Sequence, residues 1–369
     1  MKTTLTRLLK ILALLLPIAL FVFFMQTYIF CYLDQSTERI RRFYLEEENS
    51  LDVVFLGASD VPTAFAPGLA YEQNGFTSYL YTIDGNPGSL YKYQLKEILS
   101  KQDPQAIIVE VNGFLYNDGY QNQEVRLRMF AESIPFSLNK LDAIYHYNVD
   151  DKIDYLFPFI KYHGDWIKGR NLLESYQWKT NKANGPALLK GITTCTLVAP
   201  YDPASIQLPG QSTPAIAEDY LVDFLEYCKD EGITDLLFVR FPHRNAATHA
   251  AAVSQVGAVL ARYGHSLLNL EEQIDEIGLD FDRDFFNDEH MNIYGMEKMT
   301  AYFGNYLADN ILESPLPQTD ANTHHWAERV AAYEVFRAYA FDLTEKGIEA
   351  WPGEEPYEIS QIEKWLNGA

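Results

Sequence analysis

The sequence is strongly acidic. Its 369 residues include 51 Asp and Glu against 29 Lys and Arg, a formal charge of −22. Nucleic-acid binding relies on Lys and Arg against phosphate, so a nucleic-acid partner is not expected. The hydrophobic fraction of 47% and the aromatic fraction of 14% exclude a disordered chain, and the length suits one large or two modest domains.

The first 50 residues predict a membrane anchor and a neck. Residues 11–33 contain no charged side chain and are long enough to cross about 30 Å of hydrocarbon as a helix. The alternative, a cleaved signal peptide, has a shorter apolar region and a small-residue cleavage site, and neither is visible. Basic residues in the tail, residues 1–10, favour a cytoplasmic N-terminus, so we expect a single-pass membrane protein with its globular part outside the cytoplasm. Residues 34–50 predict a polar, helical neck.

Strand and helix patterns alternate through residues 51–314, which we expect to form one α/β domain. Short apolar and β-branched runs predict buried strands at 51–57, 76–83, 106–111, 235–241 and 265–270. Apolar residues at helical spacing predict helices at 91–99, 216–228, 246–262 and 292–312. This alternation favours a parallel sheet covered by helices on both faces, with the site at the carboxyl ends of the strands.

Two further segments break or follow the alternation. Residues 115 to about 212 are rich in aromatic side chains, as in "YLFPFIKYHGDW", and predict a helical insertion in the domain. Residues 315–369 carry more acidic than basic side chains and predict a helical appendage after the last core helix.

A serine and a histidine stand near the two ends of this domain. Ser59 follows the first strand in "FLGASDVPTAFAP", and His290 precedes the last core helix in "FFNDEHMNIYG". If folding brings them together, the imidazole can take the hydroxyl proton while the oxygen attacks a carbonyl carbon, which is the chemistry of a Ser-His hydrolase. Taken alone, Ser59 is a common turn or capping residue, and His290 could be a surface or capping histidine.

Both stretches resemble the first and last sequence blocks of the SGNH/GDSL hydrolases. The stretches "YKYQLKEIL", "IIVEVNGF" and "FPFIKYHGDW" add a narrower likeness to a membrane-anchored bacterial branch, related to envelope acyl-transfer proteins of the teichoic-acid D-alanylation type. The resemblance covers roughly residues 50 to 310. It implies a flavodoxin-like three-layer α/β/α fold with a parallel sheet, Ser59 as the nucleophile and His290 as the base.

The chain departs from the family pattern beside this histidine. The family places an Asp three positions before the His, where this chain has Asn287, followed by Asp288. An amide oxygen can hold the imidazole but stabilises the imidazolium poorly, and the Asp-to-Asn change in another triad costs about 10⁴ in kcat. The sequence leaves three interpretations open: Asp288 takes the role, Asn287 serves weakly, or activity is lost.

The resemblance also implies where an oxyanion hole would lie. The family uses the N–H of the serine, a glycine after the second strand and an Asn side chain after the third. Asn112 fits the last role, although it could instead satisfy backbone groups at its strand end. Gly85 in "TIDGNPG" is the candidate glycine, with Thr82 or Asn86 as alternatives on spacing.

Other polar side chains carry weaker predictions. His163 and Trp166 in the insertion could line a glycan or acyl site, although packing within the insertion is the favoured interpretation. Arg240 and His243 in "RFPHRN" could meet an anionic polymer, with solvated loop charge as the favoured alternative. We expect no metal and no cofactor, because neither a ligand cluster nor a nucleotide-binding loop is visible.

The combined prediction is an SGNH-type esterase or O-acyltransferase, tethered to the cell membrane and acting outside the cytoplasm. Its expected substrate is an acyl ester, with acetyl favoured, on a cell-envelope glycopolymer. The expected partners are the membrane, this glycan and a candidate membrane acyltransferase. The alternative is a non-catalytic envelope protein of the same fold that binds the polymer or such a partner.

Overall fold

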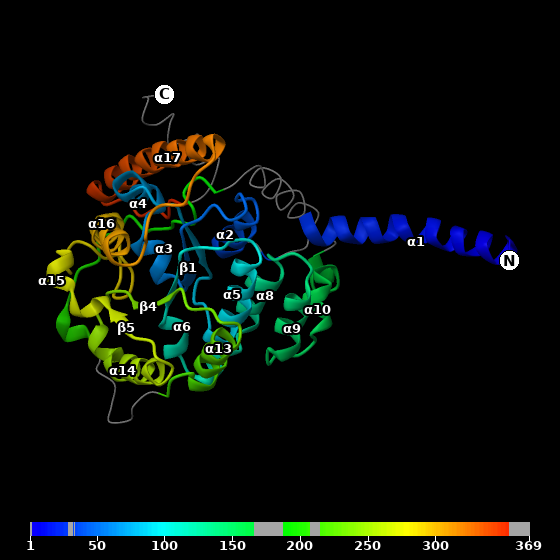
Figure 1. Cartoon of the computed structure of the whole chain (residues 1–369), viewed down its shortest axis with the longest axis horizontal. Helices are drawn as coiled ribbons and strands as arrows, with labels where there is room; N and C mark the ends of the chain where they lie inside the picture. The colour runs from blue at the N-terminus through cyan, green and yellow to red at the C-terminus, as the bar shows by residue number, and fades with distance from the viewer. Residues whose placement is uncertain (1, 29–31, 33, 166–186, 207–214, 354–369) are drawn as a thin grey trace.

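Five parallel strands form the centre of the globular part (Figure 1). The structure is a computed structural model, and it describes all residues except 1, 29–31, 33, 166–186, 207–214 and 354–369. The strand order is β2-β1-β3-β4-β5, which is the flavodoxin-like order. The strands are β1 (Val53–Gly57), β2 (Ser78–Thr82), β3 (Ala106–Glu110), β4 (Leu236–Arg240) and β5 (Leu267–Asn269). The predicted parallel sheet is confirmed, and each observed strand lies inside its predicted range.

Helices follow the strands and cover both faces of the sheet. The longer ones are α4 (Pro67–Asn74), α5 (Tyr91–Leu99), α13 (Glu218–Asp230), α14 (Ala246–Arg262) and α16 (Ile293–Asn310). Short helical turns are α3 (Asp60–Ala64), η1 (Gly88–Leu90), α6 (Asn112–Leu115), η3 (Pro203–Ser205), η4 (Leu270–Glu272) and α15 (Ile274–Ile277).

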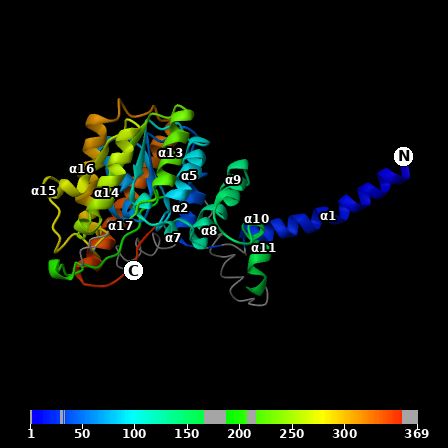
Figure 2. The same cartoon turned by 90° about the horizontal axis from the view of Figure 1, so that it is seen from below.

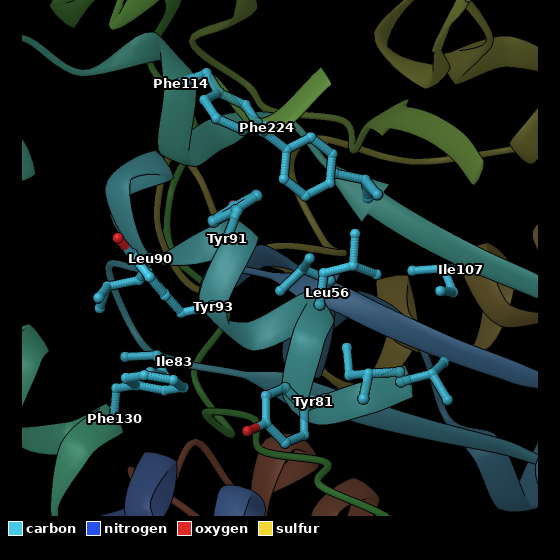
Figure 3. Packing of buried hydrophobic residues seen from close by; sticks show 14 of the residues in the cluster. Leu56, Tyr81, Ile83, Leu90, Tyr91, Tyr93, Ile107, Phe114, Phe130 and Phe224 are labelled. Carbon is cyan, nitrogen blue, oxygen red and sulfur yellow. The ribbon is translucent and has the colours of Figure 1, made fainter. Parts of the chain in front are cut away.

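Alternate residues of each strand enter two hydrophobic clusters, one on each face. Val54 and Leu56 of β1 share a cluster with side chains of α5, α13 and α14 (Figure 3), whereas Val53 and Phe55 share one with side chains of α3, α4 and α16. Successive strand residues point to opposite faces, so a sheet buried on both faces needs continuous apolar runs such as "VVFL". The result is the expected three-layer α/β/α arrangement.

The N-terminal helix α1 (Lys2–Tyr28) runs away from the globular part (Figures 1 and 2). Its stretch Thr4–Gln26 is long and apolar enough to cross a membrane, and a signal sequence would meet the same criteria. The following helix α2 (Gln35–Phe43), in the predicted neck, does not stand free. Ile40 and Phe43 are fully buried, and α2 packs beside β2 at the edge of the sheet.

The insertion is helical where the structure describes it. Its helices are α7 (Asp118–Gln121), α8 (Glu124–Ala131), α9 (Leu138–His146), α10 (Ile153–Leu156), α11 (Pro158–Lys161) and η2 (Tyr162–Asp165). The described chain resumes at residue 187 and returns to the sheet, where the Lys190 carbonyl accepts a hydrogen bond from Leu80 N. Gly191 has a φ of +100°, and a Cβ there would lie 2.9 Å from the Leu80 carbonyl oxygen, so this approach requires glycine.

The C-terminal appendage is packed onto the domain. Its helix α17 (Asp320–Glu345) lies against α4, with Trp326, Tyr333 and Phe336 fully or almost fully buried. Beyond the helix, residues 348–353 run beside the insertion, where Thr193 and Gly353 form an antiparallel bridge. This segment also contacts the loop that carries His290, through Trp351 and Phe286.

Candidate active site

Ser59 lies immediately beyond the carboxyl end of β1. The strand ends at Gly57, and Ser59 is the N-cap of the short helix α3. A Cβ at Gly57 would lie 2.7 Å from Cβ of Glu110 on neighbouring β3, so only glycine lets the two strands approach this closely. Ser59 is partly exposed, which leaves its hydroxyl open to a substrate.

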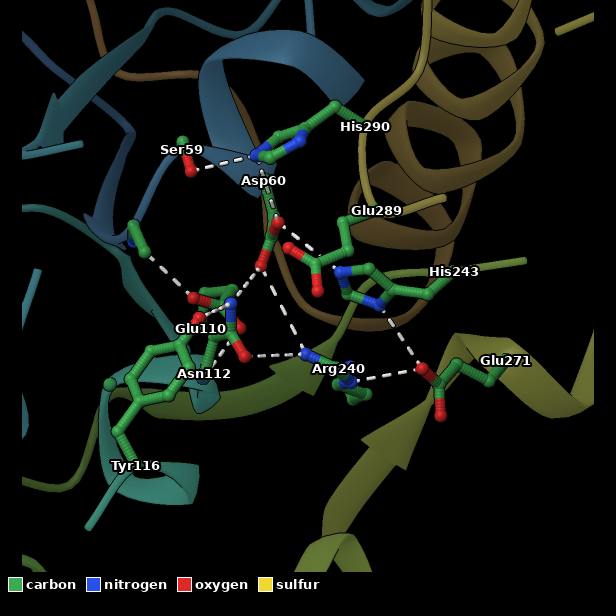
Figure 4. Close-up of polar contacts among 12 residues, drawn as sticks. Ser59, Asp60, Glu110, Asn112, Tyr116, Arg240, His243, Glu271, Glu289 and His290 are labelled. Atoms are coloured by element: carbon green, nitrogen blue, oxygen red, sulfur yellow. Dashed lines mark hydrogen bonds and ion pairs between the residues drawn. The ribbon is translucent and has the colours of Figure 1, made fainter. Parts of the chain in front are cut away.

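His290 faces Ser59 across the rim of the sheet (Figure 4). Its Nε2 lies 2.8 Å from Ser59 Oγ, although 231 positions separate the two residues. An antiparallel bridge between Phe285 and Met291 closes the loop that carries the histidine, and Asn292 caps α16 directly after it. The imidazole is 17% exposed, so this pair is reachable from solvent.

Asn287 holds the other side of the imidazole. Its Oδ1 lies 3.0 Å from His290 Nδ1 and also accepts hydrogen bonds from the backbone N–H groups of Glu289 and His290. An amide oxygen only accepts, so Nδ1 carries the proton and Nε2 is free to accept from the serine hydroxyl. The arrangement selects the tautomer that a general base needs.

Asp288 lies apart from the imidazole. Its carboxylate pairs with Arg244 at 3.0 Å, and its backbone carbonyl accepts a hydrogen bond from Arg244 N. Of the two side chains that the sequence offered for the third position, the structure brings Asn287 to His290 and directs Asp288 to Arg244.

A carboxylate that the sequence did not single out lies beside the imidazole of His290. Asp60 follows the serine and is 2% exposed, and its Oδ1 lies 3.6 Å from His290 Nε2 and 3.2 Å from His243 Nε2. Burial alone would raise the pKa of Asp60, but the charge and the hydrogen bond of His243, together with the charge of Arg240, outweigh it and hold the pKa well below the ordinary value. Asp60 therefore carries a negative charge at neutral pH.

Asp60 belongs to a buried network of charges below the serine (Figure 4). Arg240 is 1% exposed, and its Nε donates to Glu271 Oε1 at 3.0 Å. His243 lies between the two acids, with Nδ1 3.1 Å from Glu271 and Nε2 toward Asp60. Burial and Arg240 would lower the pKa of His243, yet the two carboxylates raise it to about 9. Arg240 and His243 are thus neither solvated loop charges nor positioned to meet a polymer.

Glu110, the last residue of β3, completes the network beside the end of β1. Its carboxyl group accepts hydrogen bonds from the N–H of Ala58 at 3.3 Å and of Asn112 at 2.6 Å. Complete burial, together with the neighbouring charge of Asp60, raises the pKa of Glu110 to about 8. The side chain is therefore mostly protonated at neutral pH, which keeps a third negative charge out of the buried cluster.

The side chain of Asn112 is fully engaged in the same network. Its Nδ2 donates to Asp60 Oδ2 at 2.7 Å and to the Tyr116 hydroxyl at 2.9 Å, and its Oδ1 accepts from Arg240. Both amide protons are used, so Asn112 is not a free oxyanion donor in this arrangement. The backbone N–H of Ser59, in contrast, has no acceptor within the described part of the chain.

The two candidates after β2 serve the backbone of that region. Gly85 occupies a turn with a φ of +61°, and a Cβ there would meet the Tyr120 hydroxyl and Arg126. Asn86 is fully buried and donates through Nδ2 to the Gly57 carbonyl and to Gln94. Asn86 therefore links the end of β1 to α5, and its amide group is engaged inside the protein.

Of the two candidates from the insertion, the structure describes only His163, and it has no contact with this site. His163 lies exposed in η2, and its Nδ1 is 2.8 Å from the Ile160 carbonyl oxygen. Trp166 lies outside the described residues. Within the described ranges, no group of three or more His, Cys, Asp or Glu side chains has an arrangement that could hold a metal ion.

Aromatic side chains extend the site on the side of His290. The Phe286 ring stacks on the imidazole at a centroid distance of 5.5 Å, and the Trp351 ring meets Phe286 edge-on at 5.2 Å. Trp351 is 51% exposed and comes from the segment that follows α17. Nothing in the sequence pointed to Trp351. Asp60, directly after Ser59, and Glu110, at the end of the third predicted strand, could have been considered because acids at strand ends lie at the edge of the sheet where the site is expected.

Comparison with known proteins gives little further guidance. No family profile matches the chain, and no curated protein matches it. One similar solved structure is a protein assigned as a GDSL-like lipase from Parabacteroides merdae, at 11% sequence identity and a TM-score of 0.30, covering 73% of this chain and 99% of the other. A likeness at this level carries no argument, so the functional assignment depends on the geometry of the site.

Proposed function

We propose that this chain is a serine hydrolase or O-acyltransferase of the SGNH type that acts on acyl esters. The observation that carries the proposal is the hydrogen-bonded row of Ser59 Oγ, the His290 ring and Asn287 Oδ1. This row contains a nucleophile, a base and a group that orients the base, which is the minimum that nucleophilic acyl transfer requires.

The reaction begins with neutral His290. Nε2 takes the proton of Ser59 as Oγ attacks the carbonyl carbon of the ester, and the N–H of Ser59 is the donor available to the developing oxyanion. The tetrahedral intermediate then expels its alcohol, which takes the proton from His290, and an acyl-serine remains. Water or a sugar hydroxyl, deprotonated by the same nitrogen, attacks this ester and regenerates the serine.

Asp60 supplies the negative charge that Asn287 lacks. Its Oδ1 lies 3.6 Å from His290 Nε2, the atom that becomes protonated, and it stays ionised in the buried network. The two functions that one carboxylate performs in a Ser-His-Asp triad are divided here: Asn287 fixes the tautomer, and Asp60 stabilises the imidazolium.

A carbohydrate ester in the cell envelope is the substrate class we propose. Trp351 and Phe286 form an apolar, partly exposed surface next to the base, and an aromatic ring of this kind suits the apolar face of a sugar. Helix α1 suits an enzyme whose substrate is fixed in the envelope, and we propose that it stays as an anchor with the N-terminus in the cytoplasm.

The alternative is a non-catalytic envelope protein that binds the polymer or a membrane acyltransferase. Two observations favour it: an amide occupies the position of the usual acid, and both amide protons of Asn112 are bonded within the protein. In that case the Ser59–His290 hydrogen bond would have a structural role and no catalytic one.

A fluorophosphonate probe applied to the full chain in detergent separates the two functions. An enzyme is labelled, Ser59→Ala abolishes labelling, and the surface control Ser254→Ala leaves it unchanged. Wild-type protein that stays unlabelled at every pH between about 6 and 9 contradicts the catalytic proposal.

A further inference from the structure

Exposed apolar side chains are concentrated in one part of the globular surface. Outside α1, ten large hydrophobic side chains are exposed in the described chain, and six of them lie between residues 136 and 160. Leu138 is the most exposed of them at 84%, followed by Phe136 at 76%. A soluble surface rarely gathers so many side chains of this kind, and such patches mark sites of interaction.

These side chains come from the short helices of the insertion. α9, α10 and α11 lie at the side of the globular part from which α1 leaves (Figures 1 and 2). A hollow of about 450 Å³ between α9 and α10 is lined by Leu138, Tyr145, Lys152 and Leu156. Leu156 also lines a second hollow, of about 430 Å³, which opens beside α1. The surface is therefore continuous from α9 to α1.

The last turns of α1 pack directly against this region. The rings of Phe21 and Phe159 meet at 6.5 Å, and Phe23 and Gln26 line the second hollow together with Phe136. Thr4–Gln26 is 23 residues long, about 34 Å as a helix, against a hydrocarbon thickness of about 30 Å. The end of this span, and with it α11, would lie at the boundary between acyl chains and headgroups.

We propose that this surface inserts into the outer interfacial layer of the same bilayer that α1 spans. The inserting side chains are Phe136, Leu138, Tyr145, Ile153, Phe157 and Ile160. The proposal rests on α1 being retained as an anchor, and it is independent of the catalytic proposal. An aromatic and aliphatic surface at this depth is typical of interfacial contacts.

Apolar burial, and not attraction to anionic lipid, drives the contact. Around the surface, Lys140 and Lys152 are accompanied by Asp142 and Asp154, and the whole chain has a charge of −22. Zwitterionic lipid is therefore sufficient for insertion. A second copy of the chain or a protein partner would cover the same side chains without lipid contact, so the experiment must detect lipid itself.

Depth-dependent quenching tests the proposal on the full chain in vesicles. The environment-sensitive fluorophore NBD is attached to single cysteines introduced as Leu138→Cys or Ile153→Cys in a Cys31→Ser background; the native Cys195 and Cys228 are buried. The control is Ser254→Cys, exposed on α14 in the same anchored protein. Phospholipids that carry a doxyl quencher near the headgroup report lipid contact.

We expect blue-shifted emission at positions 138 and 153, and quenching about threefold stronger than at position 254, in phosphatidylcholine vesicles with or without phosphatidylglycerol. Equal quenching and water-like emission at all three positions would overturn the proposal. Blue-shifted emission without doxyl quenching would also overturn it, since it indicates a protein occupant. Because Leu138 and Ile153 are exposed, circular dichroism should show unchanged folding in each variant.

Discussion

Oδ1 of Asp60 lies 3.6 Å from the nitrogen of His290 that faces Ser59, so the residue after Ser59 places a buried negative charge beside the imidazole. Asn287, on the opposite side of the ring, supplies a hydrogen-bond acceptor without charge. Asn287 therefore orients the imidazole, whereas Asp60 lies where it would stabilise the charged form. Substitution of one residue leaves the contact of the other in place.

Asp60→Asn removes the charge beside the base. We expect kcat for p-nitrophenyl acetate to fall about 10²-fold, because the imidazolium loses its counter-charge. The change also leaves Arg240 and His243 with only one carboxylate partner, so the free energy of unfolding should fall by about 3–5 kcal/mol. Urea titration gives the second quantity, and kcat is then expressed per folded molecule.

Asp288→Asn is the matched control for Asp60. This carboxylate is half-exposed and pairs with Arg244, away from the ring, so both kcat and stability should stay close to wild type. An Asp60→Asn protein that is destabilised but retains its full kcat would show that Asp60 is structural only.

Asn287→Asp places a carboxylate at the Nδ1 side of the His290 ring. The new side chain can keep the three hydrogen bonds that Asn287 Oδ1 now accepts, so the geometry should be preserved. We expect kcat/KM to rise about tenfold or more, because the charge stabilises the imidazolium directly. Ester hydrolysis measures the effect, and a fall in kcat/KM would mean that two acids beside one imidazole hold it in the protonated form.

Glu110→Gln tests the raised pKa of the buried carboxyl group at the end of β3, through the pH dependence of stability. The pKa of Glu110 is about 8 in the folded protein, against an ordinary value of 4.5. The bound proton therefore favours the folded state at low pH, and this contribution to the free energy of unfolding is lost as the pH rises from 4.5 to about 8. His243, with a pKa raised from 6.5 to about 9, acts in the same direction at higher pH.

Glutamine does not titrate, so the variant's free energy of unfolding should fall less steeply between about pH 5 and pH 8 than that of wild type. Urea unfolding at several pH values measures this slope. Glu231→Gln, the same chemical change on the surface after α13, should leave the slope as in wild type. Parallel curves for wild type and Glu110→Gln would refute the raised pKa.

Trp351→Ala tests the aromatic surface beside His290. Because Trp351 is 51% exposed, the fold should persist, and hydrolysis of p-nitrophenyl acetate should change little. We expect KM for an acetylated polysaccharide to rise about tenfold, since one aromatic stacking contact is lost. Ile348→Ala, an equally exposed change in the same segment, is the control; an equal loss on both substrates would instead indicate a disturbed loop.

The layered fold was accessible from the sequence because its signals are local. Strands buried on both faces require unbroken apolar runs, and runs such as "VVFL" and "AIIV" are visible without knowledge of their neighbours. The proximity of Ser59 and His290 followed from their places at strand and helix ends, which a parallel sheet brings to one edge. Their catalytic roles stay predictions.

Other features depend on tertiary partners that no local pattern reveals. Asn287 and Asp288 are adjacent, and the choice between them depends on Arg244, a residue from another loop. Arg240 and His243 look like loop charges until Glu271 and Asp60 enclose them. The burial of α2 was similarly hidden, because its polar composition suits a solvated neck while its apolar side chains meet the sheet edge.

The short distance along the chain between α1 and the sheet bears on where the proposed reaction would take place. Helix α1 ends at Tyr28 and α2 begins at Gln35, already packed beside β2, so the connection extends at most about 25 Å. With α1 as the proposed anchor, the proposed enzyme would not reach through the depth of a cell wall. It would modify polymer only as the chains pass through a thin zone directly above the lipid, so the timing of modification relative to polymer export would determine which chains receive it.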